Sequence, residues 1–164
     1  MEQLIVSPIK RLELVMGKIL PYILIGYTQI TVILMAGSFV FRVPVRGSLI
    51  LLYFVAFEFI SANLALGLFL STIAKTQQQA MQLAFLIILP TILLSGYMFP
   101  FQAMPKPAQW IGSILPVTHF LRIVRGVVLK NARFGDILPE MGKLGAILAV
   151  LIWRTTSRFQ KTLD

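Results

Sequence analysis

Residues 19–41 read ILPYILIGYTQITVILMAGSFVF, a stretch without a charged side chain. At a rise of about 1.5 Å per residue, a helix of this length crosses a hydrocarbon layer of about 30 Å with some tilt. The rest of the chain is similar in character, since 57% of its 164 residues are hydrophobic and only 13% are charged. Soluble domains carry roughly 25% charged residues. The composition therefore predicts an integral membrane protein.

Two further apolar stretches predict two further spans. Residues 48–74 carry Glu58 as their only charge, and residues 80–99 carry none. Because the loops between the stretches are short, we expect adjacent antiparallel helices. A last apolar stretch, residues 142–153, would be roughly 18 Å long as a helix, which is too short to cross a bilayer unaided.

The predicted fold is an all-α membrane protein, a polytopic transmembrane helical bundle with three clear spans plus a short fourth in one domain over residues 1–164. Residues 100–141 precede the last helix and contain five prolines between short apolar pieces. This pattern is typical of short helices that lie in the membrane interface or enter the bilayer and return. Residues 154–164 form a short basic tail.

A group of basic side chains follows Pro116 in this region. His119, Arg122 and Arg125 are three residues apart, so they point to roughly one side of a short amphipathic helix. We expect that side to snorkel toward the interface, or to meet lipid phosphates or an anionic substrate headgroup.

The sequence contains no recognisable soluble active site. Without cysteine and with one histidine, the chain cannot build a thiolate or histidine-rich metal site. Its two Gly-Lys pairs lack the other residues of a phosphate-binding loop. We therefore expect no cofactor, no metal and no enzymatic activity. The formal charge of +9 is carried by residues that flank apolar stretches, which favours membrane lipid over nucleic acid as the anionic partner.

Glu58 lies near the middle of the second predicted span, where a charged side chain costs roughly 2.5–3.5 kcal/mol on insertion scales. Helical spacing places Ser61 on the same face, and Gln29 of the first span is a candidate partner. Two interpretations remain open. Glu58 either fastens two helices together by hydrogen bonding or lines a substrate path. A membrane-embedded enzyme is disfavoured, because one isolated carboxylate is a poor catalytic set.

Residues 2–18 read EQLIVSPIKRLELVMGK, a short amphipathic piece and a basic piece separated by Ser-Pro. Pro8 interrupts any continuous helix because it pushes the preceding residue toward an extended conformation. The segment predicts a membrane-surface helix or a docking site for a soluble partner.

Two segments together resemble the ABC-2 family of ABC-transporter membrane subunits. Residues 2–18 are similar to the coupling segment that these permeases carry before their third span. LLSGYMFPFQAMP and WIGSILPVTHFLRIVRGVVLK, within residues 93–130, resemble the family's S-G-x-x-x-P-x-x-x-M-P exit followed by L-P and R-G. We call this region the outer-side motif. Its matching residues here are Ser95, Gly96, Pro100, Pro105, Pro116, Arg122 and Arg125.

The outer-side motif carries a local prediction of its own. We expect Ser95 and Gly96 to let the third span bend or pack closely. We expect Pro100 and Pro105 to stop its helix and turn the chain.

The resemblance implies a permease subunit of an ATP-driven exporter, a multi-pass protein of the bacterial inner membrane. It implies two partners, a separate ABC ATP-binding subunit and a second permease subunit. The N-terminus, Lys75 and residues 154–164 would lie in the cytoplasm, and residues 100–141 on the outer side. Coupling to the ATP-binding subunit would fall to Glu2, Leu4, Pro8 and Arg11. No residue identifies the substrate.

The chain also departs from the family pattern. Family permeases usually have six spans, whereas this chain starts at the coupling segment and offers three spans plus a short fourth. It therefore resembles the C-terminal portion of a permease. The alternative function is a truncated, transport-inactive fragment or a small membrane scaffold protein.

Overall fold

The computed structural model describes residues 11–43 and 46–161, and within these ranges the side chains from residue 20 to residue 155. This part of the chain contains six α-helices and no strand, which confirms the predicted all-α class. The helices are α1 (Arg11–Phe39), α2 (Leu49–Ile73), α3 (Gln77–Leu94), α4 (Lys106–Ile114), α5 (Pro116–Lys130) and α6 (Phe134–Lys161), with a 3₁₀ turn, η2 (Phe101–Ala103), between α3 and α4.

Three of these helices are long and apolar enough to cross a membrane, namely Leu20–Phe39 within α1, α2 and α3. α4 and α5 form a bent pair with an angle of 88° between them, the geometry of a broken span or a re-entrant loop. The polytopic helical bundle predicted from the sequence is confirmed.

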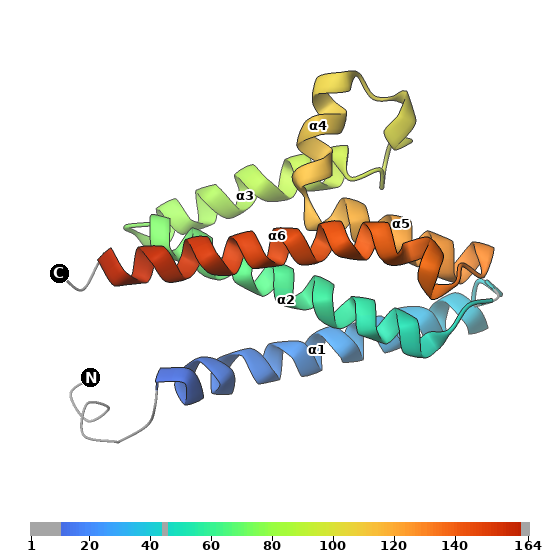
Figure 1. The fold of residues 1–164 in the computed structure, drawn as a ribbon, viewed down its shortest axis with the longest axis horizontal. Helices are drawn as coiled ribbons and strands as arrows, with labels where there is room; N and C mark the ends of the chain where they lie inside the picture. The colour runs from blue at the N-terminus through green and yellow to red at the C-terminus, as the bar shows by residue number, and fades with distance from the viewer. Residues whose placement is uncertain (1–10, 44–45, 162–164) are drawn as a thin grey trace.

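The connections are distributed over two ends of the bundle (Figure 1). The start of α1, the end of α6 and the α2–α3 turn lie at one end, whereas the α1–α2 connection and the α5–α6 turn lie at the other. α3 stops before it reaches this second end. α4 then runs across the bundle axis, and α5 resumes the direction of α3.

The buried core lies where α2, α5 and α6 meet. α5 is therefore an internal helix and does not lie flat on the surface of the bundle. The Phe59 and Phe120 rings stack beside the core, with centroids 4.1 Å apart. The core side chains are Leu52, Val55 and Ala62 of α2, Ile123 and Val127 of α5, and Ile137, Met141 and Leu144 of α6.

α1 is peripheral and packs chiefly against α2. The Tyr27 hydroxyl donates to the Tyr53 carbonyl oxygen at 3.2 Å, and the hydroxyl groups of Thr31 and Tyr53 are 2.7 Å apart. Gly26 allows the Ile60 side chain to approach the α1 backbone. None of the apolar window of α1 is buried within the described bundle. Its outward face therefore meets lipid or another polypeptide.

α6 differs from the short helix predicted for residues 142–153. It is one helix of 28 residues, about 42 Å long at 1.5 Å per residue, which exceeds the thickness of a hydrocarbon core. Glu140 and Lys143 interrupt its apolar run, but their side chains pair at 2.9 Å on one face of the helix. The predicted bounds were therefore wrong, because hydropathy shows where a helix is apolar and not where it ends.

Leu144, fully buried at the core, tests whether the α2–α5–α6 contact holds the bundle together. Leu144→Ala is expected to lower the free energy of unfolding by about 2–5 kcal/mol, because the lost methyl groups leave a cavity. The matched control is Leu86→Ala on α3, where the side chain is 68% exposed. It is expected to change stability by about 0.5 kcal/mol or less. Unfolding by SDS in mixed micelles, followed by tryptophan fluorescence, measures both. Equal losses of unfolding free energy in the two variants would show that the α2–α5–α6 contact does not stabilise the bundle.

Candidate functional site at the elbow between α3 and α6

The chain between α3 and α6, residues 95–133, forms an elbow whose first turn is at Gly96. α3 ends at Leu94, and the Ser95 N–H bonds the Thr91 carbonyl oxygen at 3.2 Å. Gly96 then adopts φ +88°, a left-handed conformation that glycine takes readily and other L-residues rarely. The predicted end of the third span, at residue 99, was therefore wrong. The chain has left the helix before Pro100.

The prolines of the outer-side motif mark helix starts instead. Pro100 directly precedes η2, Pro105 is the N-cap residue of α4, and Pro116 is the first residue of α5. Proline suits the first turn of a helix because its missing N–H would have no intrahelical partner there. These residues thus begin three short helical pieces and do not stop α3.

Gly112 sets the close approach of α4 to the end of α3. A Cβ atom at this position would lie 2.4 Å from the Leu94 carbonyl oxygen and 2.9 Å from the Phe101 ring. Any larger residue would push the two helices apart. The glycine therefore fixes the distance at which the elbow folds back on α3.

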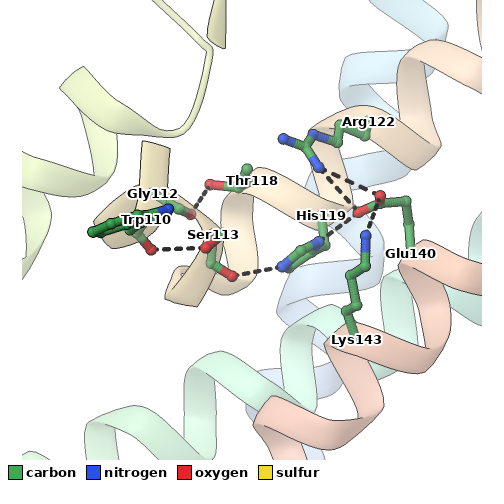
Figure 2. Close-up of polar contacts among 8 residues, drawn as sticks. All are labelled: Trp110, Gly112, Ser113, Thr118, His119, Arg122, Glu140 and Lys143. Carbon is green, nitrogen blue, oxygen red and sulfur yellow. Dashed lines mark hydrogen bonds and ion pairs between the residues drawn. The ribbon is translucent and has the colours of Figure 1, made fainter. Parts of the chain in front are cut away.

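Three side chains of α5 donate hydrogen bonds to carbonyl groups at the ends of α3 and α4. The Arg125 Nη2 donates to the Gly96 carbonyl oxygen at 2.9 Å. The Thr118 hydroxyl donates to the Gly112 carbonyl oxygen at 2.5 Å, and the His119 Nε2 to that of Ser113 at 2.8 Å (Figure 2). The last carbonyl groups of a helix lack intrahelical donors, and leaving them unpaired in apolar surroundings is costly. α5 therefore closes the end of α4 and binds the chain just beyond the end of α3.

His119 also connects the elbow to α6. Its ring is 2% exposed, and its Nδ1 lies 2.5 Å from the Glu140 Oε2. Both ring nitrogens thus face acceptors, a carboxylate and a backbone carbonyl (Figure 2). His119 thus joins the last turn of α4 to α6.

Glu140 lies in α6, before the apolar stretch 142–153, and holds three basic groups. Besides His119, the Lys143 Nζ lies 2.9 Å and the Arg122 Nη1 3.4 Å from its Oε1. Burial alone raises the pKa of Glu140, but the hydrogen bonds from His119 and Lys143 and the charges of Arg122 and Lys143 lower it to about 2. The carboxylate therefore stays ionised near neutral pH and ties α5 to α6.

Arg122 completes the connection to the segment that follows Gly96. Its guanidinium carbon lies 4.3 Å from the centroid of the Phe101 ring, a cation–π contact. Arg125 holds the start of this segment and Arg122 holds its 3₁₀ turn. The two arginines of the outer-side motif thus bind the first half of the same motif.

The prediction that this side of α5 meets lipid phosphates or a substrate headgroup was wrong for His119, which is buried. Arg122 and Arg125 have internal partners and remain partly exposed, so for them the interpretation stays a prediction. Sequence reasoning missed Thr118 and Glu140. The sequence could have indicated the role of Glu140. An acidic side chain in a largely apolar helix needs a basic partner, and α5 is rich in basic residues.

Glu58 is the second candidate and faces α6. A Cβ atom added at Gly145 would lie 2.8 Å from the Glu58 Oε1. The Glu58 Oε2 is buried and has no hydrogen-bond partner in the described structure. Ser61 is half-buried one turn further along α2. Gln29 is exposed on α1 and has no hydrogen bond to Glu58, so the expected pairing is not formed. Gly26, and not Gln29, faces α2.

The candidate coupling residues lie at the other end of the chain. Glu2, Leu4 and Pro8 fall outside the described residues. Arg11 is the first residue of α1, but its side chain is not among those described.

Comparison with known proteins gives one family. Residues 1–155 match the family described as ABC-2 family transporter protein. The chain is 36% identical over 149 residues to the probable multidrug ABC transporter permease YbhR of Escherichia coli (strain K12), which covers 91% of this chain and 40% of that protein.

Two other relatives from the same organism agree. The probable multidrug ABC transporter permease YbhS is 34% identical over 132 residues, 80% of this chain and 35% of that protein. The inner membrane transport permease YhhJ is 30% identical over 164 residues, 99% of this chain and 44% of that protein. The chain thus spans about two-fifths of the length of these relatives. No solved structure matches the chain.

Gly112 provides a test of the elbow. Gly112→Ala is expected to destabilise the bundle by about 1–3 kcal/mol, because its Cβ atom forces α4 away from Leu94. Gly142→Ala in α6, where a Cβ atom would meet nothing within 4 Å, is the control. It is expected to gain up to about 1 kcal/mol from helix propensity. SDS unfolding compares the two variants, and a loss of stability at Gly142 alone would contradict the packing described for α4.

Glu140 makes a prediction for acid conditions. Its pKa is lowered from 4.5 to about 2 by folding, so its contribution to stability is complete above about pH 4.5. As the pH falls from about 4.5 toward 2, the unfolded state binds the proton first and this contribution is lost. Glu140→Gln should therefore remove that part of the pH dependence of unfolding measured in micelles. Parallel wild-type and variant curves over this window would show that the ion-pair cluster is not formed.

Proposed function

We propose that this chain, which belongs to the ABC-2 family of transporter proteins, forms a membrane-spanning part of a permease that works with a separate ATP-binding subunit. ATP binding and hydrolysis by that partner drive export of an unidentified substrate across the bacterial inner membrane. A second permease subunit completes the transporter. The family match over residues 1–155 is the observation that carries the proposal.

The relatives and the site agree with this role. The three E. coli relatives are named as permeases, two of them as probable multidrug permeases. The elbow contains no set of groups suited to bond-breaking chemistry. Its charged side chains bind each other and helix ends, as expected of a structural element in a membrane bundle.

In the proposed mechanism, the segment around Glu2, Leu4, Pro8 and Arg11 contacts the ATP-binding subunit on the cytoplasmic side. α1 continues without a break from Arg11 to Phe39, so a displacement at its start reaches the far end of the bundle. ATP shifts the permease between two states because the partner binds ATP more tightly in one arrangement than in the other.

α3 is the helix that we assign to the substrate path or to the second permease subunit. No residue of α3 is buried within the described bundle, although α3 is long and apolar enough to span the membrane. Glu58 and Ser61 lie on α2, and Glu58 points at α6. We therefore assign Glu58 to helix packing, with Gly145 as the residue that makes room for it.

We place the elbow on the outer side of the membrane, with the N-terminus, Lys75 and the C-terminal tail in the cytoplasm. The elbow then forms the outer end of the bundle wall. Hydrogen bonds hold α5 against α4 and the chain that follows α3, and ion pairs hold α5 against α6.

Recovery of a complex tests the proposed function. The tagged chain, purified in mild detergent from the membranes of its source cell, is expected to bring down an ATP-binding subunit that hydrolyses ATP. Leu4→Asp and Pro8→Ala are expected to reduce that recovery several-fold, because they alter the proposed contact surface. Lys75→Gln, in the α2–α3 turn at the same end of the bundle, is the control and should leave recovery unchanged.

The outcomes separate two claims. If the wild-type chain recovers no ATP-binding subunit, the permease proposal fails. If it recovers one and the Leu4 and Pro8 variants do so equally well, the coupling role of residues 2–11 fails while the permease role stands.

A further inference from the structure

A cavity of about 570 Å³ lies between α1 and α2, at the end of the bundle where these two helices are connected. It is separate from the elbow, the Glu58 contact and the coupling segment. Its lining is apolar over most of its surface, with a few polar groups and one charged group. The lining residues are Thr31, Leu34, Met35, Ser38, Arg42, Val43, Leu49 and Tyr53.

The hydroxyl groups in this cavity have no hydrogen left to donate to a ligand. The Thr31 hydroxyl donates to the Tyr27 carbonyl oxygen at 2.8 Å, so it must accept from the Tyr53 hydroxyl at 2.7 Å. The Ser38 hydroxyl donates to the Met35 carbonyl oxygen at 3.2 Å. Among the lining side chains, Arg42 is therefore the one with hydrogens left to donate to a bound molecule.

Arg42 is held beside the cavity in an unusual backbone conformation. Its φ of +51° lies in the left-handed region, which glycine or asparagine usually occupies after a helix. The Val43 N–H bonds back to the Gly37 carbonyl oxygen at 3.0 Å and fixes this turn. No acidic residue pairs with the Arg42 guanidinium in the part of the chain that the structure describes. A strained position thus carries an unpaired cation at a cavity, which is a reason to look for function there.

The surroundings of the cavity are those of a membrane interface. Phe39 and Phe41 next to Arg42 are 77% and 74% exposed, and Ile50 at the start of α2 is 84% exposed. Leu34, Met35 and Leu49 give the cavity an apolar wall below the cation. A ligand that matches this arrangement has an anionic head at Arg42 and a hydrocarbon chain against α1 and α2.

We propose that this cavity binds an anionic phospholipid, with the phosphate paired to Arg42 and an acyl chain lying against Leu34 and Met35. Arginine suits this role because its planar guanidinium can donate two parallel hydrogen bonds to a phosphate. The lipid joins the ends of α1 and α2, which otherwise share few polar contacts beyond Tyr27, Thr31 and Tyr53. This binding does not depend on the proposed transport function.

Native mass spectrometry of the full chain, released from micelles loaded with phosphatidylglycerol or phosphatidylcholine of the same acyl composition, tests the site. The wild-type chain is expected to retain phosphatidylglycerol preferentially, because the choline cation of phosphatidylcholine offsets the phosphate charge beside Arg42. Arg42→Gln should reduce that retention at least about tenfold, because a charge-assisted hydrogen bond to phosphate is lost. Arg46→Gln is the matched control. The Arg46 side chain is exposed outside the cavity and its backbone N–H bonds the Val128 carbonyl oxygen at 3.2 Å, which the substitution leaves intact.

Arg42→Gly separates lipid binding from folding. It relieves the left-handed strain, so the melting temperature in phosphatidylcholine should rise, while the rise that phosphatidylglycerol gives the wild-type chain should disappear. Met35→Trp should also reduce retention, because the larger ring occupies part of the surface along which the acyl chain lies and leaves Arg42 in place. Retention unchanged in Arg42→Gln, or lost equally in Arg46→Gln, would overturn the proposal. So would inorganic phosphate that raises the melting temperature as much as phosphatidylglycerol does.

Discussion

Backbone carbonyl groups at interrupted helices are the constraint around which this bundle is organised. Two helices, α3 and α4, end inside it, and apolar surroundings offer no water to satisfy their last carbonyl groups. α5 supplies the donors from Thr118, His119 and Arg125. Thr118 and His119 bind the last carbonyl groups of α4, and Arg125 binds the Gly96 carbonyl just beyond the end of α3. The polar residues of α5 thus follow from the two helix ends that lie beside it.

The same residues give the elbow its attachment to α6. His119 and Arg122 reach Glu140, and Lys143 approaches the carboxylate from the next turn. Several basic groups around one acid satisfy the acid fully and leave an excess of positive charge. Desolvation offsets part of this attraction, but the hydrogen bonds and basic charges around the half-buried Glu140 outweigh it and keep the carboxylate ionised. α2 supplies the apolar surface against which α5 and α6 pack.

The sequence predicted the class of fold and the bounds of α2 closely, because α2 is an apolar run that begins at a side-chain cap, Ser48. It failed where structure depends on contacts between distant segments. The spacing of the basic residues on α5 predicted a shared side, but their partners, Gly96 and Glu140, are 29 and 21 residues away from Arg125 and His119. Periodicity carries no information about such pairs.

Hydropathy gave the wrong bounds for α6, again because a contact was unknown. The charges of Glu140 and Lys143 predict an end to the apolar run, since the sequence does not show that the two side chains pair with each other. The coupling segment, by contrast, remains a matter of resemblance alone, because it lies outside the described residues.

The composition of α6 has a consequence for how the protein is made. α6 is not among the described helices that are apolar enough to cross a membrane by themselves. A segment of this kind partitions poorly from the translocon into lipid on its own. Its buried residues and its ion pairs match surfaces on α2 and α5, both synthesised earlier. We therefore expect α6 to enter the membrane by packing against α2 and α5 and not on its own.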